Sequence, residues 1–144
     1  MIKVLFVCHG NICRSPMAEF VMKDIVNRAG VGDQFEIASA AVSREELGND
    51  IYPPAKRMLK EHGVAFAPRH ARLVGSADLA YYDRIYYMDS RNLSYLRRLF
   101  GNDAHKCRPL LPQDVADPYY SGDFTQTWED IVTGCNRILE ECTC

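Results

Sequence analysis

A short apolar run near the start of the chain leads through a loop into a helix, and this unit limits the possible folds more than any other feature. Residues 2–7 have the length and composition of a buried strand. Pro16 stands where a first helical turn is expected, and helix-forming residues continue to about Arg28. A buried strand followed directly by a helix is typical of a sheet whose parallel strands are covered by helices.

The same alternation of strands and helices continues through all 144 residues. Helices between strands imply right-handed crossovers and parallel strands, with ligands bound at the carboxyl ends of the strands. The size suits one domain, residues 1–144, and no repeat divides it. We therefore predict an α/β fold, a single-domain doubly wound four-stranded parallel sheet flanked by helices. Further strands are expected at residues 35–39, 84–88 and 106–111, and further helices at 54–62, 76–80, 92–99 and 124–141.

The loop after the first strand has the composition of a phosphate-binding site built around a thiol. Cys8 and Arg14 enclose five residues, and Ser15 follows. Unpaired N–H groups at a helix start favour an anion, and together with an arginine they stabilise a thiolate. Cys8 is thus a candidate nucleophile, Arg14 offers a planar pair of donors to a phosphoryl group, and Ser15 can donate a hydrogen bond to the sulfur. Gly10 and Asn11 suit the left-handed backbone angles that turn amides inward. The predicted phosphate-binding residues are His9, Gly10, Asn11, Ile12, Cys13 and Arg14.

Residues 7–19 resemble the signature of the low-molecular-weight protein tyrosine phosphatases. Further similarities to that family follow in order along nearly the whole chain. They lie at residues 39–41, 53–55, 61–63, 70–72, 88–92 and 117–120. The resemblance implies a phosphatase with the fold predicted above and with no metal or cofactor.

The resemblance also implies a two-step hydrolysis of phosphotyrosine. Thiolate Cys8 attacks phosphorus while Arg14 and the loop amides hold the oxygens, which gives a cysteinyl-phosphate. The family pattern places the general acid at Asp117, which protonates the leaving tyrosine oxygen and then activates water. Without the resemblance, Asp117 and Pro118 would indicate no more than a turn. The implied partners are phosphotyrosine-containing proteins, with inorganic phosphate or vanadate as inhibitors.

Other residues match positions that support the site in the family. Asn11, Ser39 and His70 are expected to preorganise the loop through hydrogen bonds, although such residues are more often ordinary structural polar groups. Asp89 resembles a second acidic residue near the active site. A helix N-cap is the alternative for Asp89, and both roles can hold at once.

The choice of substrate depends on the residues around the loop. Tyr119 and Tyr120 are expected to form an aromatic wall for a phenyl ring, with simple packing as the alternative. Glu45 stands where some family members have an aromatic wall residue, so the opposite wall differs here. Protein-arginine phosphatases of similar sequence carry threonine at Ile12, and related arsenate reductases carry extra cysteines, which residues 78–92 lack. Tyrosine phosphatase activity is therefore favoured over these activities and over a catalytically silent phosphate-binding module.

Charge and hydropathy disfavour two other classes of protein. The 17 basic and 19 acidic residues are mixed along the chain and give a net charge of −2, which does not suggest a nucleic-acid-binding surface. No stretch approaches the roughly 20 apolar residues of a membrane span. Residues 2–7 are too short for a signal peptide. We expect a cytoplasmic protein.

The six cysteines are expected to be free thiols, because the chain has no secretion signal and no Cys-x-x-Cys pair. Cys13 lies five residues after Cys8, and a disulfide between them would protect an oxidised nucleophile. The alternative is that Cys13 only packs beneath the loop. Cys107 and Cys135 are expected in or near the core. Cys142 and Cys144 are regarded as incidental, with no metal site.

Overall fold

The protein contains a four-stranded parallel sheet. The computed structural model describes residues 1–143. The strands have the spatial order β2-β1-β3-β4, and every neighbouring pair is parallel. The predicted sheet is confirmed. Its strands are β1 (Ile2–Cys8), β2 (Phe35–Ala41), β3 (Arg84–Tyr87) and β4 (Cys107–Pro109).

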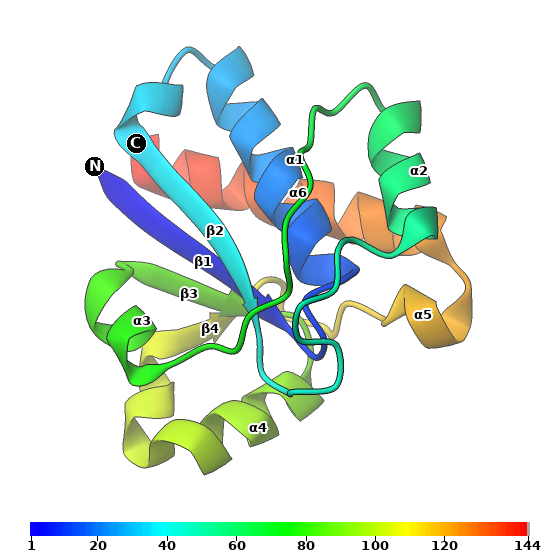
Figure 1. Ribbon diagram of the computed structural model, residues 1–144. Helices are drawn as coiled ribbons and strands as arrows, with labels where there is room; N and C mark the ends of the chain where they lie inside the picture. Colours follow the sequence, from blue (N-terminus) through cyan, green and yellow to red (C-terminus); the bar gives the residue numbers. More distant parts are fainter. Residues whose placement is uncertain (144) are drawn as a thin grey trace.

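Helices cover both faces of this sheet (Figure 1). One face carries the first and last long helices, which pack against each other, and the other face carries two helices from the middle of the chain. The α-helices are α1 (Arg14–Arg28), α2 (Pro53–Glu61), α3 (Ser76–Tyr81), α4 (Ser90–Phe100), α5 (Pro118–Ser121) and α6 (Phe124–Thr143). Two 3₁₀ turns are η1 (Gly32–Gln34) and η2 (Gly101–Lys106).

Several elements differ from the predicted bounds for local reasons. α1 begins at Arg14, two residues before Pro16, because the first N–H groups of a helix need no intrahelical partner and proline is tolerated among them. β4 is shorter than predicted and ends at Pro109, which has no N–H to offer a neighbouring strand. The four-residue helix α5 was not predicted, since Asp117 and Pro118 indicate only a turn.

The sheet separates two hydrophobic cores. Val4, Phe6 and Cys8 of β1 belong to the core on the α1 and α6 side. Leu5 and Val7 belong to the core on the α3 and α4 side. This division follows from the alternation of side chains along a strand. β1 is therefore buried from both sides, and Cys8, its last residue, is held at a rigid position.

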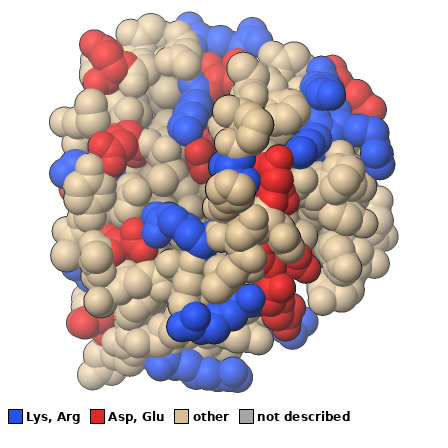
Figure 2. All heavy atoms as spheres, in the orientation of Figure 1, with Lys and Arg blue, Asp and Glu red and all other residues tan. Residues whose placement is uncertain are grey.

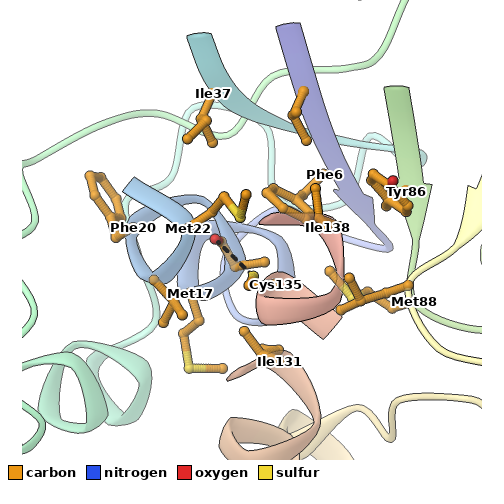
Figure 3. Packing of buried hydrophobic residues seen from close by; sticks show 14 of the residues in the cluster. Phe6, Met17, Phe20, Met22, Ile37, Tyr86, Met88, Ile131, Cys135 and Ile138 are labelled. Carbon is orange, nitrogen blue, oxygen red and sulfur yellow. Dashed lines mark hydrogen bonds between the residues drawn. The ribbon is translucent and has the colours of Figure 1, made fainter. Parts of the chain in front are cut away.

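Two cysteines lie in these cores, as predicted. Cys135 of α6 is fully buried, and its Sγ lies 3.7 Å from the Ala18 carbonyl of α1 (Figure 3). Cys107 is buried on the other side of the sheet. Gly134 brings α6 close to the segment after β4, because a Cβ there would lie 2.5 Å from Leu110 Cγ. Cys144 lies outside the described residues.

The surface carries both signs of charge. Figure 2 shows acidic and basic side chains interspersed over one face of the molecule. In the part of the chain that the structure describes, no helix combines the length and the apolar character that crossing a membrane requires.

Candidate active site

The loop predicted to bind phosphate, residues 8–15, is called the phosphate loop below and leads from the end of β1 into α1 at the carboxyl end of the sheet (Figure 1). Asn11 adopts the predicted left-handed conformation with φ = +60°. The same prediction for Gly10 is wrong, since its φ is not positive. Glycine is suited to this position for a different reason: a Cβ would lie 3.1 Å from Glu46 Cγ, so its absence lets Glu46 pack against the loop.

Cys8 is 3% exposed, and its sulfur faces the start of α1. Ser15 Oγ lies 3.0 Å from Cys8 Sγ, and the Ser15 backbone N–H donates to the same sulfur at 3.4 Å. Both groups belong to the first turn of the helix, where N–H groups have no partner within the helix. The expected contact between Ser15 and the thiol is therefore present.

A chain of hydrogen bonds reaches the sulfur from the neighbouring strand and helix. Asn11 Nδ2 donates to Ser15 Oγ at 2.8 Å and to Ser39 Oγ at 3.0 Å. Ser39 Oγ donates to Glu19 Oε1 at 2.6 Å. Ser15 Oγ accepts from the amide and still has its own hydrogen to donate to Cys8 Sγ. The predicted roles of Asn11 and Ser39 thus agree with the contacts that they make.

Arg69 completes this chain and was not predicted. Its Nη2 donates to Asn11 Oδ1, which also accepts from the Arg72 backbone N–H at 3.4 Å. These donors hold the amide oxygen on their side, so that Nδ2 must face the two serines. His70 is exposed, and its Nδ1 lies 2.9 Å from the Gly48 carbonyl. The direct contact with the phosphate loop thus comes from Arg69 and not from its neighbour.

No signal in the spacing of residues marks Arg69. The long segment between α2 and α3 runs past the carboxyl end of β2 (Figure 1), and its Arg69 reaches Asn11 of the phosphate loop. This segment is irregular backbone without helical or strand periodicity, so its sequence does not predict which of its side chains face the loop.

Arg14 is 2% exposed and bound to two acidic side chains from distant parts of the chain. Its Nη1 donates to Asp89 Oδ2 at 2.6 Å and to the Val115 carbonyl at 2.8 Å. Its Nη2 lies 3.3 Å from Asp117 Oδ2. Burial acts to lower the pKa of Arg14, but negative charges, first Cys8 and then Asp117, outweigh it and raise the pKa. The guanidinium is therefore charged and fixed in orientation.

The two acidic residues are each held by a helix start. Asp89 is the N-cap of α4 and accepts from the Asn92 N–H at 2.8 Å, so it serves as a cap and as a partner of Arg14 at once. Asp117 is the N-cap of α5, and its Oδ1 accepts from the Tyr119 N–H at 3.1 Å. Both carboxylates thus face the phosphate loop in defined orientations.

A cleft of about 110 Å³ opens above the phosphate loop. α5 and the loop after β2 flank it. Tyr119 and Tyr120 line it from α5 and are 50% and 72% exposed, while Tyr52 packs against Tyr119 with ring centroids 5.2 Å apart. Glu45 and Glu46 line it from the loop after β2. Every predicted wall residue therefore borders one cleft, which also contains Cys8, Arg14 and Asp117.

A doubly wound sheet that ends in a loop with this thiol and this arginine defines a class of small phosphatases. The chain belongs to the low molecular weight phosphotyrosine protein phosphatase family, whose model matches residues 3–143. Both the predicted family and the predicted enzyme class are confirmed.

Individual relatives agree with this assignment. The chain is 38% identical to the low molecular weight protein-tyrosine-phosphatase YfkJ of Bacillus subtilis, over 96% of this chain and 94% of that protein. It is 39% identical to the low molecular weight phosphotyrosine protein phosphatase of Sus scrofa, with the same two coverages. The crystal structure of YfkJ superposes with a TM-score of 0.93, covering 98% of this chain and 94% of that one at 36% identity. A Drosophila arginine phosphatase has a TM-score of 0.88 at 29% identity, covering 99% of each chain.

Proposed function

We propose that this tyrosine phosphatase works through a phosphorylated Cys8, with Arg14 binding the phosphoryl group and Asp117 transferring protons. The observation that carries the proposal is the convergence of the three side chains on one cleft. Cys8 Sγ lies 3.0 Å from Ser15 Oγ at the start of α1, and Arg14 Nη2 lies 3.3 Å from Asp117 Oδ2. A nucleophile, an anion-binding group and an acid thus lie within one phosphoryl site.

The contacts of Arg14 indicate which of its donors bind the phosphoryl oxygens. Nη1 is occupied by Asp89 and the Val115 carbonyl. Nη2 has a longer contact of 3.3 Å with Asp117 Oδ2 and keeps a second hydrogen, which together with that of Nε gives a planar edge that matches two phosphoryl oxygens. Backbone N–H groups of the phosphate loop bind the remaining charge.

The reaction takes place in two displacements. The Cys8 thiolate attacks phosphorus, the bond to the tyrosine oxygen breaks, and Asp117 gives its proton to that oxygen. Asp117 then takes a proton from water as the water oxygen attacks phosphorus, which breaks the bond to sulfur and releases inorganic phosphate. None of these steps calls for a metal ion or a cofactor. Phosphate, as the product, and vanadate, as its analogue, are expected to inhibit.

Phosphotyrosine fits the cleft better than shorter phosphorylated side chains. The phenyl ring can contact Tyr119 and Tyr120 while the phosphoryl group reaches the loop below. Ile12 lines the same cleft and adds an apolar surface where arginine phosphatases of similar sequence have threonine. The substrates are therefore phosphotyrosine-containing proteins. The mixed surface charge supports the expectation that nucleic acid is not a partner.

The described cysteines are free, and a thiolate nucleophile works in a reducing compartment. This supports a cytoplasmic location. It also requires that purified protein be kept reduced, because oxidation of Cys8 would remove the nucleophile.

The experiment compares turnover of p-nitrophenyl phosphate and of three peptides that differ only in a phosphotyrosine, phosphoserine or phosphoarginine. Wild-type protein is expected to prefer phosphotyrosine, and Cys8→Ser is expected to lose turnover of every substrate. Cys142→Ser is the matched control, because this thiol lies on α6 outside the cleft. Turnover retained by Cys8→Ser would remove the proposed mechanism, and a preference for phosphoarginine would remove the proposed substrate.

A further inference from the structure

Two adjacent carboxylates, Glu45 and Glu46, border the mouth of the cleft. We call these two residues the acidic rim. The side chain of Glu45 is 64% exposed, so that its charge faces the solvent through which a substrate approaches. An acidic rim is unexpected at a site that binds a phosphate dianion, since like charges repel.

Glu45 is held in place by the residue that follows the nucleophile. His9 Nε2 donates to Glu45 Oε2 at 2.8 Å, because a carboxylate can only accept. The His9 side chain is 19% exposed, and its ring packs edge-on against Tyr95 with centroids 5.4 Å apart. His9 is therefore itself constrained, and it fixes Glu45 beside the phosphate loop.

Glu46 is also anchored. Asn49 Nδ2 donates to Glu46 Oε2 at 2.7 Å, and the Glu46 side chain lies against Gly10. Both carboxylates of the acidic rim are thus oriented before a substrate arrives. An oriented charge loses less conformational freedom on binding than a freely rotating one.

The cleft contains little positive charge with which to neutralise the acidic rim. Among the described residues that line the cleft, Arg14 is the only lysine or arginine. It is buried and already bound to Asp89 and Asp117. Arg91 lines a smaller adjoining pocket beside Asp89 and Asp117. Among the described residues, neither carboxylate of the acidic rim forms an ion pair with a lysine or an arginine, and Glu45 is bound by His9 alone. A cation brought by the substrate would therefore find negative charge available at the mouth of the cleft.

We propose that the acidic rim selects phosphotyrosine segments with lysine or arginine next to the phosphotyrosine, and disfavours segments with aspartate or glutamate there. The inference rests on the proposed function, because it concerns the residues that flank a phosphotyrosine seated in the cleft. Neighbouring residues of an extended peptide are spaced by about 3.3–3.6 Å, so their side chains lie at the rim when the phosphoryl group is in the loop. Glu45 and Glu46 are specificity-determining residues, and His9 is a positioning residue for Glu45.

The test uses peptides of one neutral sequence with phosphotyrosine at the centre and lysine, alanine or glutamate on both sides of it. The kcat/KM values are measured at low ionic strength. An exposed charge pair changes affinity by about two- to fivefold, so lysine is expected to exceed glutamate by about tenfold, with alanine between them. The ratio is expected to fall in high salt, which screens exposed charges within a few ångströms.

Charge variants locate the effect. Glu45→Gln is expected to reduce the lysine-to-glutamate ratio, and Glu45→Lys to bring it to one or below. Glu140→Lys is the matched control, because Glu140 is exposed near the end of α6, at the end of the sheet away from the phosphate loop (Figure 1). It makes the same change in net charge and is expected to keep the wild-type ratio.

The role of His9 is tested by the same ratio. His9→Leu is expected to lower the ratio in wild-type protein and to have no further effect in the Glu45→Gln background, since leucine cannot hold the carboxylate. Equal turnover of the three peptides by wild-type protein, or an unchanged ratio in Glu45→Lys, would overturn the inference alone. Failure to turn over any phosphotyrosine peptide would overturn the proposed function as well.

Discussion

Arg14 and Asp89 form a partly buried ion pair of 2.6 Å, although 75 residues separate them in the sequence. Asp89 also caps α4, so the position of the guanidinium is linked to the start of a helix on the other side of the sheet. Several consequences of such links can be measured.

Replacing Asp89 separates its two roles. Asn is a good N-cap without charge, so Asp89→Asn is expected to keep most of the stability but to lower kcat/KM about tenfold, because Arg14 loses its charged partner. Asp89→Ala is expected to lower kcat/KM similarly and also to cost about 1 kcal/mol in the free energy of unfolding. Urea denaturation of both variants measures the free energy of unfolding, and steady-state kinetics measure kcat/KM. Equal stability of the two variants would exclude the capping role.

Asp117→Ala removes the proposed proton donor. The loss of kcat/KM is expected to reach about 10²–10³-fold for aryl phosphates whose leaving group is a poor one. It is expected to be much smaller for p-nitrophenyl phosphate, whose leaving group needs little protonation. A series of substituted phenyl phosphates checks this through the slope of log rate against leaving-group pKa. The same slope in variant and wild type would assign the acid to another residue.

Arg69 and His70 provide a comparison of neighbouring residues. Arg69→Met removes the donor that orients Asn11, and kcat is expected to fall about tenfold, which corresponds to about 1.4 kcal/mol in the activation barrier. His70→Ala removes only a hydrogen bond to the Gly48 carbonyl and is expected to change kcat less than twofold. Stopped-flow measurement of both variants decides between the two neighbours, and a larger loss in His70→Ala would reverse the assignment.

We propose that Cys13, which lines the same cleft as Cys8, protects Cys8 from irreversible oxidation. Burial, with the charge of Cys8 as the next cause, raises the pKa of the Cys13 thiol, so that it stays protonated and does not compete as a nucleophile. If peroxide converts Cys8 to a sulfenic acid, the Cys13 thiol can condense with it to form a disulfide and release water. In Cys13→Ser, dithiothreitol is expected not to restore activity after inactivation by peroxide. Mass spectrometry is expected to detect a sulfinic acid at Cys8 of this variant. Equal recovery of the variant and of wild type would contradict this protection.

The lowered pKa of Asp50 predicts that the stability of the protein depends on pH. A hydrogen bond to Lys56 is the main cause that lowers the pKa of Asp50 to about 2, and the carboxylate also accepts from the Arg69 backbone N–H at 3.2 Å. Because the folded pKa lies below the unfolded value of about 3.9, the stabilisation is present above that value and is lost as the pH falls towards 2. Asp50→Asn is expected to cost less than about 1 kcal/mol at pH 7, as for other exposed pairs. The difference in urea denaturation should shrink below about pH 4, and a difference that grows there would contradict the assignment.

The parts of the protein that could be predicted are those in which nearby residues decide the structure. The strand at residues 2–7, the phosphate loop and the helix after Pro16 follow from patterns that extend over a few residues, and all are present. The left-handed conformation of Asn11 also follows from its own side chain, while the constraint on Gly10 comes from Glu46, a distant residue, and so is not visible in the local sequence. Asp117 was found through the family pattern and not through its local sequence, which indicates a turn.

The order of strands and helices, and the loop that carries Cys8 and Arg14 between the first strand and the first helix, could be read from the sequence alone, because they depend on local periodicity and on the types of neighbouring residues. Three contacts could be seen only in the three-dimensional arrangement: Arg69 and not His70 orients Asn11, Asp89 both caps a helix and binds Arg14, and His9 holds Glu45. Each of these contacts joins segments that are far apart in the chain. Their geometry depends on how the crossovers and irregular loops return to the carboxyl end of the sheet, which no local pattern encodes.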